Sequence, residues 1–329
     1  MDNTRLYQIL YALAAVEGRE GALFGNCAPL AYEAFERSLA CDAFPELWFE
    51  IPLAGDSWFD LHALTARESL EPGMAFAPEA CGGVPGAFEW FAAQPDSVRQ
   101  LALSWDVSTG NIDHPAVQLL VCKPDLSVTC GFLSAVGRPD AAPAYRAFVE
   151  GLPEGWFACY TGVFPARPGH NLRVECVPDT HLREAYASDA GLLGEHLMRV
   201  CPRGVNDEAV ARCALLAKAP FQIEFQFDVE PDGTAGSTFS ASVRFAQPPG
   251  GAAWRAFEVD GLAGELMAQV EAWGLADGRW RDMAGTAFAQ GVAFGGQSTR
   301  LYCYPAFLKL RWRDGEPFDA KAYLIAGAQ

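Results

Sequence analysis

Basic and phenolic residues alternate with apolar residues in two segments near the C-terminus, which the turn-like string Asp-Gly-Glu-Pro at 314–317 separates. Because successive side chains of a β-strand point to opposite faces, each segment places its basic and phenolic residues on one face. These residues are Lys309, Arg311, Arg313, Lys321 and Tyr323. Cations on a concave surface would bind an anionic ligand such as a phosphate, so the surrounding elements decide whether such a site exists.

Two earlier segments carry further charged residues on polar strand faces. The segment 221–229 alternates without a break and places Glu224 and Asp228 on its polar face. Its expected partner strand, 239–245, carries Arg244 among its polar residues. Carboxylate oxygens are the ligands that Mg²⁺ prefers, so Asp228 together with Glu224 is a possible magnesium site.

Acidic residues and a histidine lie on the first strands that the sequence predicts. Glu50 lies between two apolar residues, and Asp60 and His62 are two residues apart, so they share a strand face. Either of them can pair with Glu50 across a hairpin. Farther along, Arg173 and Glu175 also share a face. A carboxylate beside a second acid or an imidazole is suited to general acid–base chemistry.

The overall charge limits the kinds of partner that we expect. The 329 residues include 24 Lys and Arg against 41 Asp and Glu, which gives a net charge of −17. Nucleic acids and anionic membrane surfaces both require a basic footprint, so we expect neither as a partner. A small anionic ligand remains compatible, because a few focused cations can bind it inside an acidic protein.

The cysteines and the N-terminal residues predict a cytoplasmic protein. None of the ten cysteines forms a Cys-x-x-Cys pair, so the spacing of a structural zinc site is missing. Cys159, Cys176 and Cys303 lie in strand-like runs and are expected to be small core residues. The first five residues lack the features of a signal peptide, and no run of eighteen apolar residues occurs.

A helix-like stretch followed by two strands recurs five times along the chain. The strand pairs are expected at 47–51 with 58–64, 99–106 with 116–122, 156–164 with 172–177, 221–229 with 239–245, and 307–313 with 321–325. The helix-like stretches fall at 30–39, 88–91, 144–149, 183–200, 207–218, 262–273 and 279–289. No repeat of individual residues accompanies this order, so the architecture repeats and the sequence does not.

An antiparallel sheet of ten twisted strands tends to curl and close, which removes its exposed edges. The helices between the strand pairs must cover the apolar face of the sheet, so the polar faces would line the interior. We therefore expect an α+β protein with a ten-stranded antiparallel β-barrel of five α-β-β repeats, helices outside, as a single domain over 1–329. An unrelated α+β protein with two packed sheets and a surface basic patch is the alternative.

This order of elements resembles that of the ABBA, or PT-barrel, prenyltransferases, which include aromatic and cyanobactin-type peptide prenyltransferases. The resemblance covers nearly the whole chain but includes no diagnostic string, and the Asp-Asp-x-x-Asp motif of isoprenyl synthases is absent. It implies transfer of an allylic prenyl group from its diphosphate to an aromatic small molecule or a peptide side chain in the barrel lumen. Mg²⁺ is a possible cofactor, bound through Asp228.

The resemblance also assigns roles to individual residues. It implies that basic and phenolic residues of successive strands bind the diphosphate: Arg173, Arg244, Lys309, Arg311, Lys321, Tyr323 and Tyr302. Glu50, on the first strand, takes the place of the acid that polarises or deprotonates the acceptor. Asp60, His62 and Glu224 would contact the acceptor or supply a second acid. Aromatic residues would shield the carbocation through their ring quadrupoles.

Other interpretations of the same residues stay open at this point. The chain could be a non-catalytic barrel that binds a peptide or small ligand, as an accessory protein of a biosynthetic pathway. Lys309, Arg311 and Arg313 could form a solvated face, Glu50 could be a surface carboxylate, and Arg173 could simply pair with a neighbouring acid. The curvature of the sheet separates a barrel from the two-sheet alternative, and an incubation with prenyl diphosphates and aromatic acceptors separates an enzyme from a binding barrel.

Overall fold

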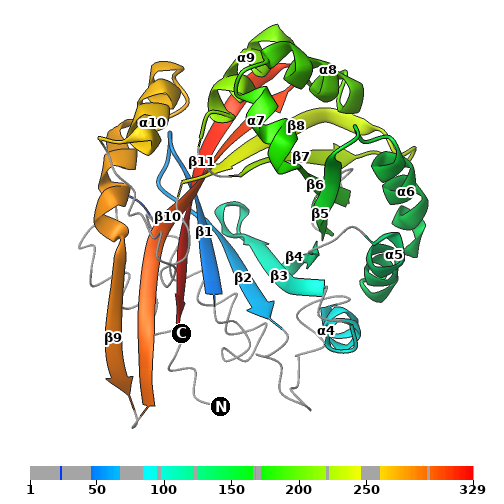
Figure 1. Cartoon of the computed structure of the whole chain (residues 1–329). Helices are drawn as coiled ribbons and strands as arrows, with labels where there is room; N and C mark the ends of the chain where they lie inside the picture. Colours follow the sequence, from blue (N-terminus) through cyan, green and yellow to red (C-terminus); the bar gives the residue numbers. More distant parts are fainter. Residues whose placement is uncertain are drawn as a thin grey trace.

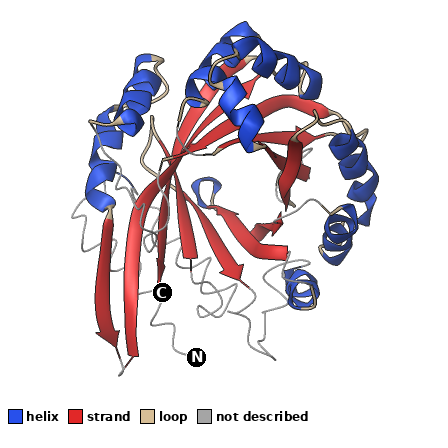
Figure 2. Cartoon of the chain, viewed as in Figure 1, coloured by secondary structure: helices blue, strands red, loops and turns tan. Residues whose placement is uncertain are grey.

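Strands lie inside a layer of helices in the computed structural model of the protein (Figures 1 and 2). The structure describes residues 23, 46–66, 84–94, 98–121, 125–165, 167, 172–219, 222–245, 260–294 and 297–328. The helix expected at 30–39 and the first residue of the expected strand 221–229 lie outside this part of the chain.

The described strands form one antiparallel sheet in the order β11-β1-β2-β3-β4-β5-β6-β7-β8-β10-β9. They are β1 (Glu46–Pro52), β2 (Asp60–Ala66), β3 (Val98–Asp106), β4 (Asn111–Val121), β5 (Trp156–Val163), β6 (Leu172–Pro178), β7 (Ile223–Val229), β8 (Ala235–Arg244), β9 (Phe288–Phe294), β10 (Gln297–Arg313) and β11 (Glu316–Ala328). Because β10 also pairs with β11, the sheet closes into a barrel of ten strands, with β9 attached outside the ring. The predicted barrel of five strand pairs is confirmed.

The barrel is apolar on its outer surface and polar on its inner surface. On β7, Phe225 and Phe227 face outward and are fully buried. Phe225 stacks on Trp156 with ring centroids 5.0 Å apart, and Phe227 lies 5.8 Å from Phe148 of the helical layer. Trp312 of β10 is likewise fully buried on the outer side. The hydrophobic core therefore lies between the sheet and the helices, which leaves the lumen to polar side chains.

The helical layer covers the outside of the barrel (Figure 1). Its α-helices are α4 (Val84–Ala92), α5 (Leu126–Ala135), α6 (Ala142–Glu150), α7 (Thr180–Tyr186), α8 (Ala190–Val200), α9 (Asp207–Leu216) and α10 (Leu262–Ala272). The 3₁₀ helices are η3 (Val107–Thr109), η4 (Pro139–Ala141) and η5 (Gly278–Thr286). Several helices begin at a side chain that accepts hydrogen bonds from the first turn, such as Asp125 before α5 and Asn206 before α9. Among the described helices, none is long and apolar enough to cross a membrane.

Two local features of β10 and β11 set which side chains enter the lumen. Asp314 and Gly315 join these strands with positive φ values of 52° and 82°, as a two-residue hairpin turn requires. A β-bulge between Pro305 and Phe307 shifts the pairing of β10 by one residue. The bulge keeps Tyr304, which precedes it, on the same inner face as Phe307.

One predicted helix is only partly correct. The stretch 279–289 was expected to be helical throughout, but the 3₁₀ helix η5 ends at Thr286 and the strand β9 begins at Phe288. β9 pairs with the first half of β10, which extends beyond the closed ring. In the sequence of residues 288–294, larger residues alternate with Ala289, Gly291 and Ala293, and this period of two is compatible with a strand.

Candidate active site in the barrel lumen

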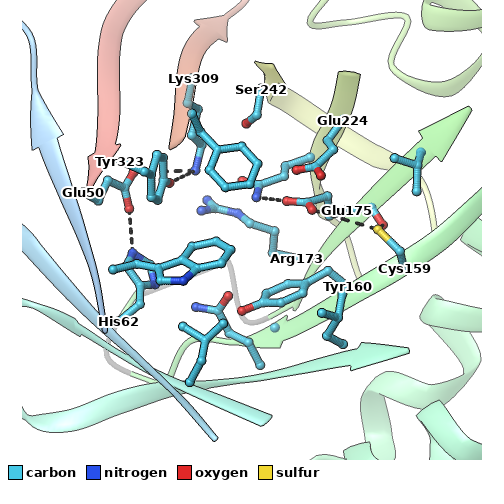
Figure 3. Close-up of a pocket in the computed structure, with 18 of the residues that line it drawn as sticks. Glu50, His62, Cys159, Tyr160, Arg173, Glu175, Glu224, Ser242, Lys309 and Tyr323 are labelled. Carbon is cyan, nitrogen blue, oxygen red and sulfur yellow. Dashed lines mark hydrogen bonds and ion pairs between the residues drawn. The ribbon is translucent and has the colours of Figure 1, made fainter. Parts of the chain in front are cut away.

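The inward faces of the strands enclose a cavity of about 300 Å³ (Figure 3). Cations, carboxyl groups and rings all reach it. Its charged lining consists of Arg99, Arg167, Arg173, Arg244, Lys309, Glu50, Glu175 and Glu224, and its ring-bearing lining of Trp48, His62, Phe157, Tyr160, Phe164, Phe307 and Tyr323. The predicted curvature is therefore present. On the basic face of β10, Lys309 is buried and Arg311 is half-buried, whereas Arg313 at the end of the strand is exposed.

Glu50 lies at the centre of a buried charge cluster. Its Oε1 is 3.6 Å from Lys309 Nζ and 3.3 Å from Lys321 Nζ. Its Oε2 is 3.0 Å from His62 Nε2. Burial alone would raise the pKa of Glu50, but the two ammonium groups and the imidazole hold this pKa well below its usual value. Glu50 is thus a carboxylate at neutral pH.

Lys309 loses its proton at a lower pH than an exposed lysine does. Its Nζ donates a hydrogen bond to the hydroxyl of Tyr323 at 3.1 Å. Burial lowers the pKa of Lys309 to about 8, in spite of the neighbouring Glu50, and the cations of Arg173, Arg311 and Lys321 act in the same direction. A ligand that brings negative charge would relieve this repulsion.

The lumen arginines differ in how fully they are paired. The Nε of Arg173 donates to Asp228 at 2.8 Å. Arg244 instead lies over the ring of Phe307, 4.7 Å from its centroid. Its buried Nε has no hydrogen-bond partner among the described residues. Arg244 therefore keeps a donor for a ligand in the cavity, and an unmet donor of this kind is costly unless a ligand satisfies it.

A second carboxyl group lies on the opposite side of the cavity. Glu224 of β7 and Glu175 of β6 are hydrogen-bonded to each other, and Gln226 donates its amide to Glu175. Burial and the neighbouring carboxyl group of Glu175 raise the pKa of Glu224 well above its usual value. Glu224 is therefore a neutral acid whose proton is bonded to Glu175, in contrast to the carboxylate of Glu50.

Three rings form an aromatic box beside the cations. Trp48 lies 5.3 Å from Phe307 and 6.2 Å from Tyr323, measured between ring centroids. Phe307 meets Tyr323 edge to face at 6.0 Å. The indole N–H of Trp48 donates to Glu46 at 2.6 Å, which fixes the plane of its ring. Such a box attracts a cation through the negative faces of its rings.

Seven of the residues proposed from the sequence line this cavity: Glu50, His62, Arg173, Glu224, Arg244, Lys309 and Tyr323. Lys321 and Asp60 lie behind Glu50, joined by an ion pair of 3.3 Å. Arg311 is paired with Asp319, and Tyr302 donates to Glu46 at 3.1 Å. Lys321, Arg311 and Tyr302 were proposed as diphosphate ligands, but none of the three lines the cavity.

The possible magnesium site at Asp228 does not fit the surrounding residues. The carboxylate of Asp228 forms an ion pair with the guanidinium of Arg173. Glu224 is hydrogen-bonded to the carboxyl group of Glu175. Within the part of the chain that the structure describes, no three His, Cys, Asp or Glu side chains are grouped so that they could hold a metal ion. We therefore assign no step to a metal.

Several lining residues were not identified from the sequence. Gln118 and Arg99 sit on strands that were predicted, and Gln118 was detectable as a single polar residue within an apolar run. Arg167 follows β5 in a loop and binds Asp106 through two of its nitrogens. Cys159 was expected in the core, but a β-bulge between Ala158 and Tyr160 turns it toward the cavity.

The chain resembles several solved structures over almost its whole length. They include a 5-dimethylallyltryptophan synthase from Streptomyces coelicolor (TM-score 0.58, 11% identity, 98% of each chain covered). A second is the prenyltransferase PriB in its apo form (TM-score 0.54, 14% identity, 98% of this chain and 94% of that one). A third is a 6-dimethylallyl tryptophan synthase (TM-score 0.51, 14% identity, 97% and 94%).

No protein-family model matches the chain, and no curated protein sequence matches it significantly. At identities this low, the structural likeness shows the fold alone. Together with the closed ring of ten strands, it shows that the chain has the PT-barrel, or ABBA, fold. The lumen of this barrel combines cations, an aromatic box and a buried carboxylate.

Proposed function

We propose that this protein transfers an allylic prenyl group from its diphosphate to an aromatic acceptor held in the barrel lumen. One observation carries the proposal. The same cavity contains Arg244, whose Nε–H has no hydrogen-bond partner among the described residues, Lys309, an aromatic box and a buried carboxylate. The structural neighbours named as dimethylallyltryptophan synthases and a prenyltransferase support the same reaction class.

The diphosphate would bind to the cations that line the cavity. Arg244 offers an unpaired Nε–H, and Lys309 lies beside it on the neighbouring strand. Arg173 would complete the set from the other side of the cavity. These groups are already in place where negative charge develops as the carbon–oxygen bond to the diphosphate breaks, so they stabilise the leaving group without reorganisation.

The prenyl fragment would lie against the aromatic box of Trp48, Phe307 and Tyr323. When the allylic bond breaks, its electron pair leaves with the diphosphate oxygen and the prenyl carbon becomes cationic. Each ring that faces this carbon would stabilise it by roughly 0.5 to 2 kcal/mol. Because water would capture the same cation, the enclosed barrel also favours transfer over hydrolysis.

Glu50 would act as the base that completes the transfer. The π-electrons of the acceptor ring form the new carbon–carbon bond, and the resulting arenium ion must lose a proton to become aromatic again. An arenium ion is a strong acid, so a carboxylate with a low pKa is basic enough to accept this proton. The ion pairs of Glu50 keep it ionised and ready. Glu224, whose proton is bonded to Glu175, would accept a hydrogen bond from a polar group of the acceptor through its other oxygen.

The products of an incubation test this proposal. The protein is incubated with dimethylallyl or geranyl diphosphate and a panel of tryptophan, tyrosine and naphthol acceptors, and the products are analysed by mass spectrometry. We expect a prenyl mass increment on at least one acceptor, lost in Glu50→Gln. If no acceptor is modified although pyrophosphate still raises the melting temperature, the alternative of a non-catalytic binding barrel is correct.

A further inference from the structure

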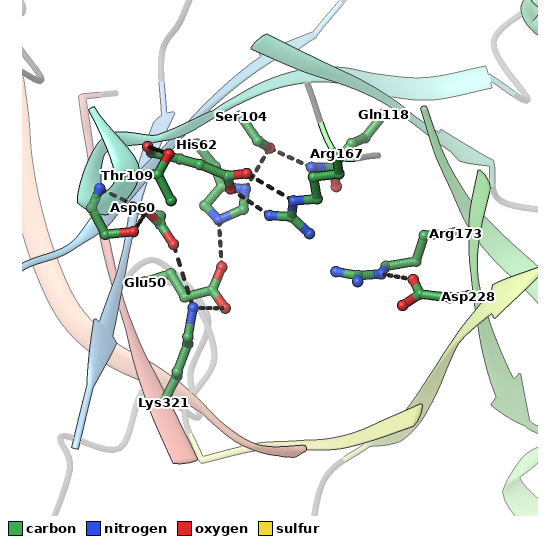
Figure 4. A network of polar contacts seen from close by, with 12 residues as sticks. Glu50, Asp60, His62, Ser104, Thr109, Gln118, Arg167, Arg173, Asp228 and Lys321 are labelled. Carbon is green, nitrogen blue, oxygen red and sulfur yellow. Dashed lines mark hydrogen bonds and ion pairs between the residues drawn. The ribbon is translucent and has the colours of Figure 1, made fainter. Parts of the chain in front are cut away.

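A series of hydrogen bonds runs from Glu50 along the inner wall of the barrel, from strand to strand (Figure 4). His62 Nε2 lies 3.0 Å from Glu50 Oε2, and His62 Nδ1 lies 2.6 Å from Ser104 Oγ. The amide of Gln118 donates to the same Ser104 oxygen. These four residues belong to the consecutive strands β1, β2, β3 and β4, so the series connects one residue of each.

The chemistry of its members gives this series a single direction. A carboxylate only accepts hydrogen bonds, so His62 must carry a proton on Nε2 to bond Glu50. In the neutral imidazole Nδ1 is then an acceptor, and the Ser104 hydroxyl must donate to it. That hydroxyl has one proton, so its oxygen must accept from elsewhere, and the Gln118 amide supplies the donor. For a neutral imidazole, this arrangement satisfies the hydrogen-bonding groups of His62 and Ser104.

The last residue of this hydrogen-bonded series, Gln118, determines what the series can do. A carboxamide does not pass a proton on, so a series that ends at Gln118 cannot conduct protons out of the lumen. Ser104 is 5% exposed and does not line the cavity, so it does not touch a bound substrate. What the series can do is hold the His62 ring in one tautomer and orientation.

We propose that Ser104, with Gln118 behind it, is a positioning residue for the base of the transfer reaction. It holds the His62 ring through Nδ1 while Glu50 selects the Nε2–H tautomer, and His62 in turn holds one oxygen of Glu50, which leaves the remaining lone pairs of the carboxylate toward the substrates. This inference rests on the proposed function, because it is the deprotonation by Glu50 that requires a fixed carboxylate.

The ¹⁵N signals of His62 provide a test that does not depend on turnover. They show which ring nitrogen carries the proton and whether Nδ1 accepts a hydrogen bond, and a His62→Gln variant identifies them among the five histidines. We expect the Nε2–H form in the wild-type protein and in both Ser104 variants, because Glu50 bonds that proton in each. In Ser104→Ala the Nδ1 signal should move toward that of an acceptor without a hydrogen bond, whereas Ser104→Thr, which keeps the hydroxyl, should leave it in place. An unchanged Nδ1 signal in Ser104→Ala would overturn the proposal.

Kinetics with prenyl diphosphate and an aromatic acceptor then show whether the hydrogen bond between Ser104 and His62 matters for the reaction. We expect Ser104→Ala to lower kcat about tenfold, as for the loss of one hydrogen bond, while the KM for the diphosphate stays within about twofold. Ser104→Thr should restore kcat. Ser134→Ala, at an exposed position of α5, is the matched control and should leave kcat unchanged.

Two kinetic results would count against a positioning role. One is an unchanged kcat in Ser104→Ala, and the other is an equal loss in Ser104→Ala and Ser104→Thr together with a lowered melting temperature. If the wild-type protein modifies no acceptor at all, the proposed function fails. The ¹⁵N spectrum of His62 then still decides whether Ser104 positions the imidazole ring.

Discussion

Two carboxyl groups on opposite sides of the lumen have pKa values that are shifted in opposite directions. On the side formed by β11, β1 and β2, Glu50 lies between two ammonium groups and an imidazole. On the side formed by β6 and β7, Glu224 lies against the carboxyl group of Glu175. Both acids are buried on inward strand faces. Neighbours alone therefore decide that one is a carboxylate and the other a neutral acid.

This difference assigns the chemical roles. A carboxylate that stays ionised is able to accept a proton, whereas a neutral carboxylic acid already holds its proton and is able only to donate it or to form hydrogen bonds. The comparison makes Glu50 the base and leaves Glu224 to bind a polar group of the acceptor. It also predicts that the same substitution has unequal effects on the two sides.

The largest expected effect comes from exchanging each acid for its amide. Glu50→Gln removes the base while keeping the side-chain shape, so kcat should fall by about 10²- to 10⁴-fold. Glu224→Gln resembles the neutral acid that is already present, so kcat should fall less than about tenfold. Both constants are measured from initial rates with saturating prenyl diphosphate. Equal losses in the two variants would remove the distinction between the two sides.

The next largest effect concerns the cation with an unmet donor. Arg244→Met removes a charged hydrogen-bond donor, so the Kd for pyrophosphate should rise about 10- to 100-fold in isothermal titration at fixed salt. Arg281→Met is the control, because Arg281 pairs with Glu271 at an exposed site outside the cavity. A Kd unchanged by Arg244→Met would place the anion site elsewhere.

A smaller effect is expected from the titration of Lys309. Since the pKa of Lys309 in the free protein is about 8, the residue is charged below this pH and loses its proton above it. Pyrophosphate affinity should therefore fall as the pH rises from 7 to 9, by at most about tenfold per pH unit. Lys309→Met should lack this decline when both proteins are titrated in the same buffers. A decline of equal size in both proteins would assign it to another group.

The smallest expected effect is on stability. Burial and Glu175 raise the pKa of Glu224 in the folded protein, so folding takes up a proton at neutral pH and stability falls as the pH rises above about 4. Glutamine takes up no proton. Glu224→Gln should therefore melt a few degrees higher than the wild-type protein at pH 7, and the two should melt alike below pH 4. A lower melting temperature for Glu224→Gln at pH 7 would contradict the assignment.

Strand facing was the part of this molecule that the sequence predicted best. The period of two in 307–313 and 221–229 identified Lys309, Glu224 and their neighbours as inward-facing, because covering an apolar face leaves the polar face to the lumen. The same argument correctly placed Glu50 and His62 on one surface. Facing depends on local alternation, which a single sequence contains.

The pairing register of the strands could not be predicted from the sequence. Glu50 meets Lys321 and Lys309 only because β1 pairs with β11 and β11 with β10, across more than 250 intervening residues in the case of β1 and β11. The bulge at Cys159 changed the facing of one residue. Bulges and long-range pairing are set by packing of the closed barrel, so alternation within one strand does not reveal them.

A crystal structure with a thiolodiphosphate analogue of the prenyl donor would test the central claim most directly, since this analogue binds without ionising readily. The account predicts that the diphosphate contacts Arg173, Arg244 and Lys309, and that the prenyl chain lies against Trp48, Phe307 and Tyr323. Binding outside the lumen, or a diphosphate that contacts none of these three cations, would contradict it.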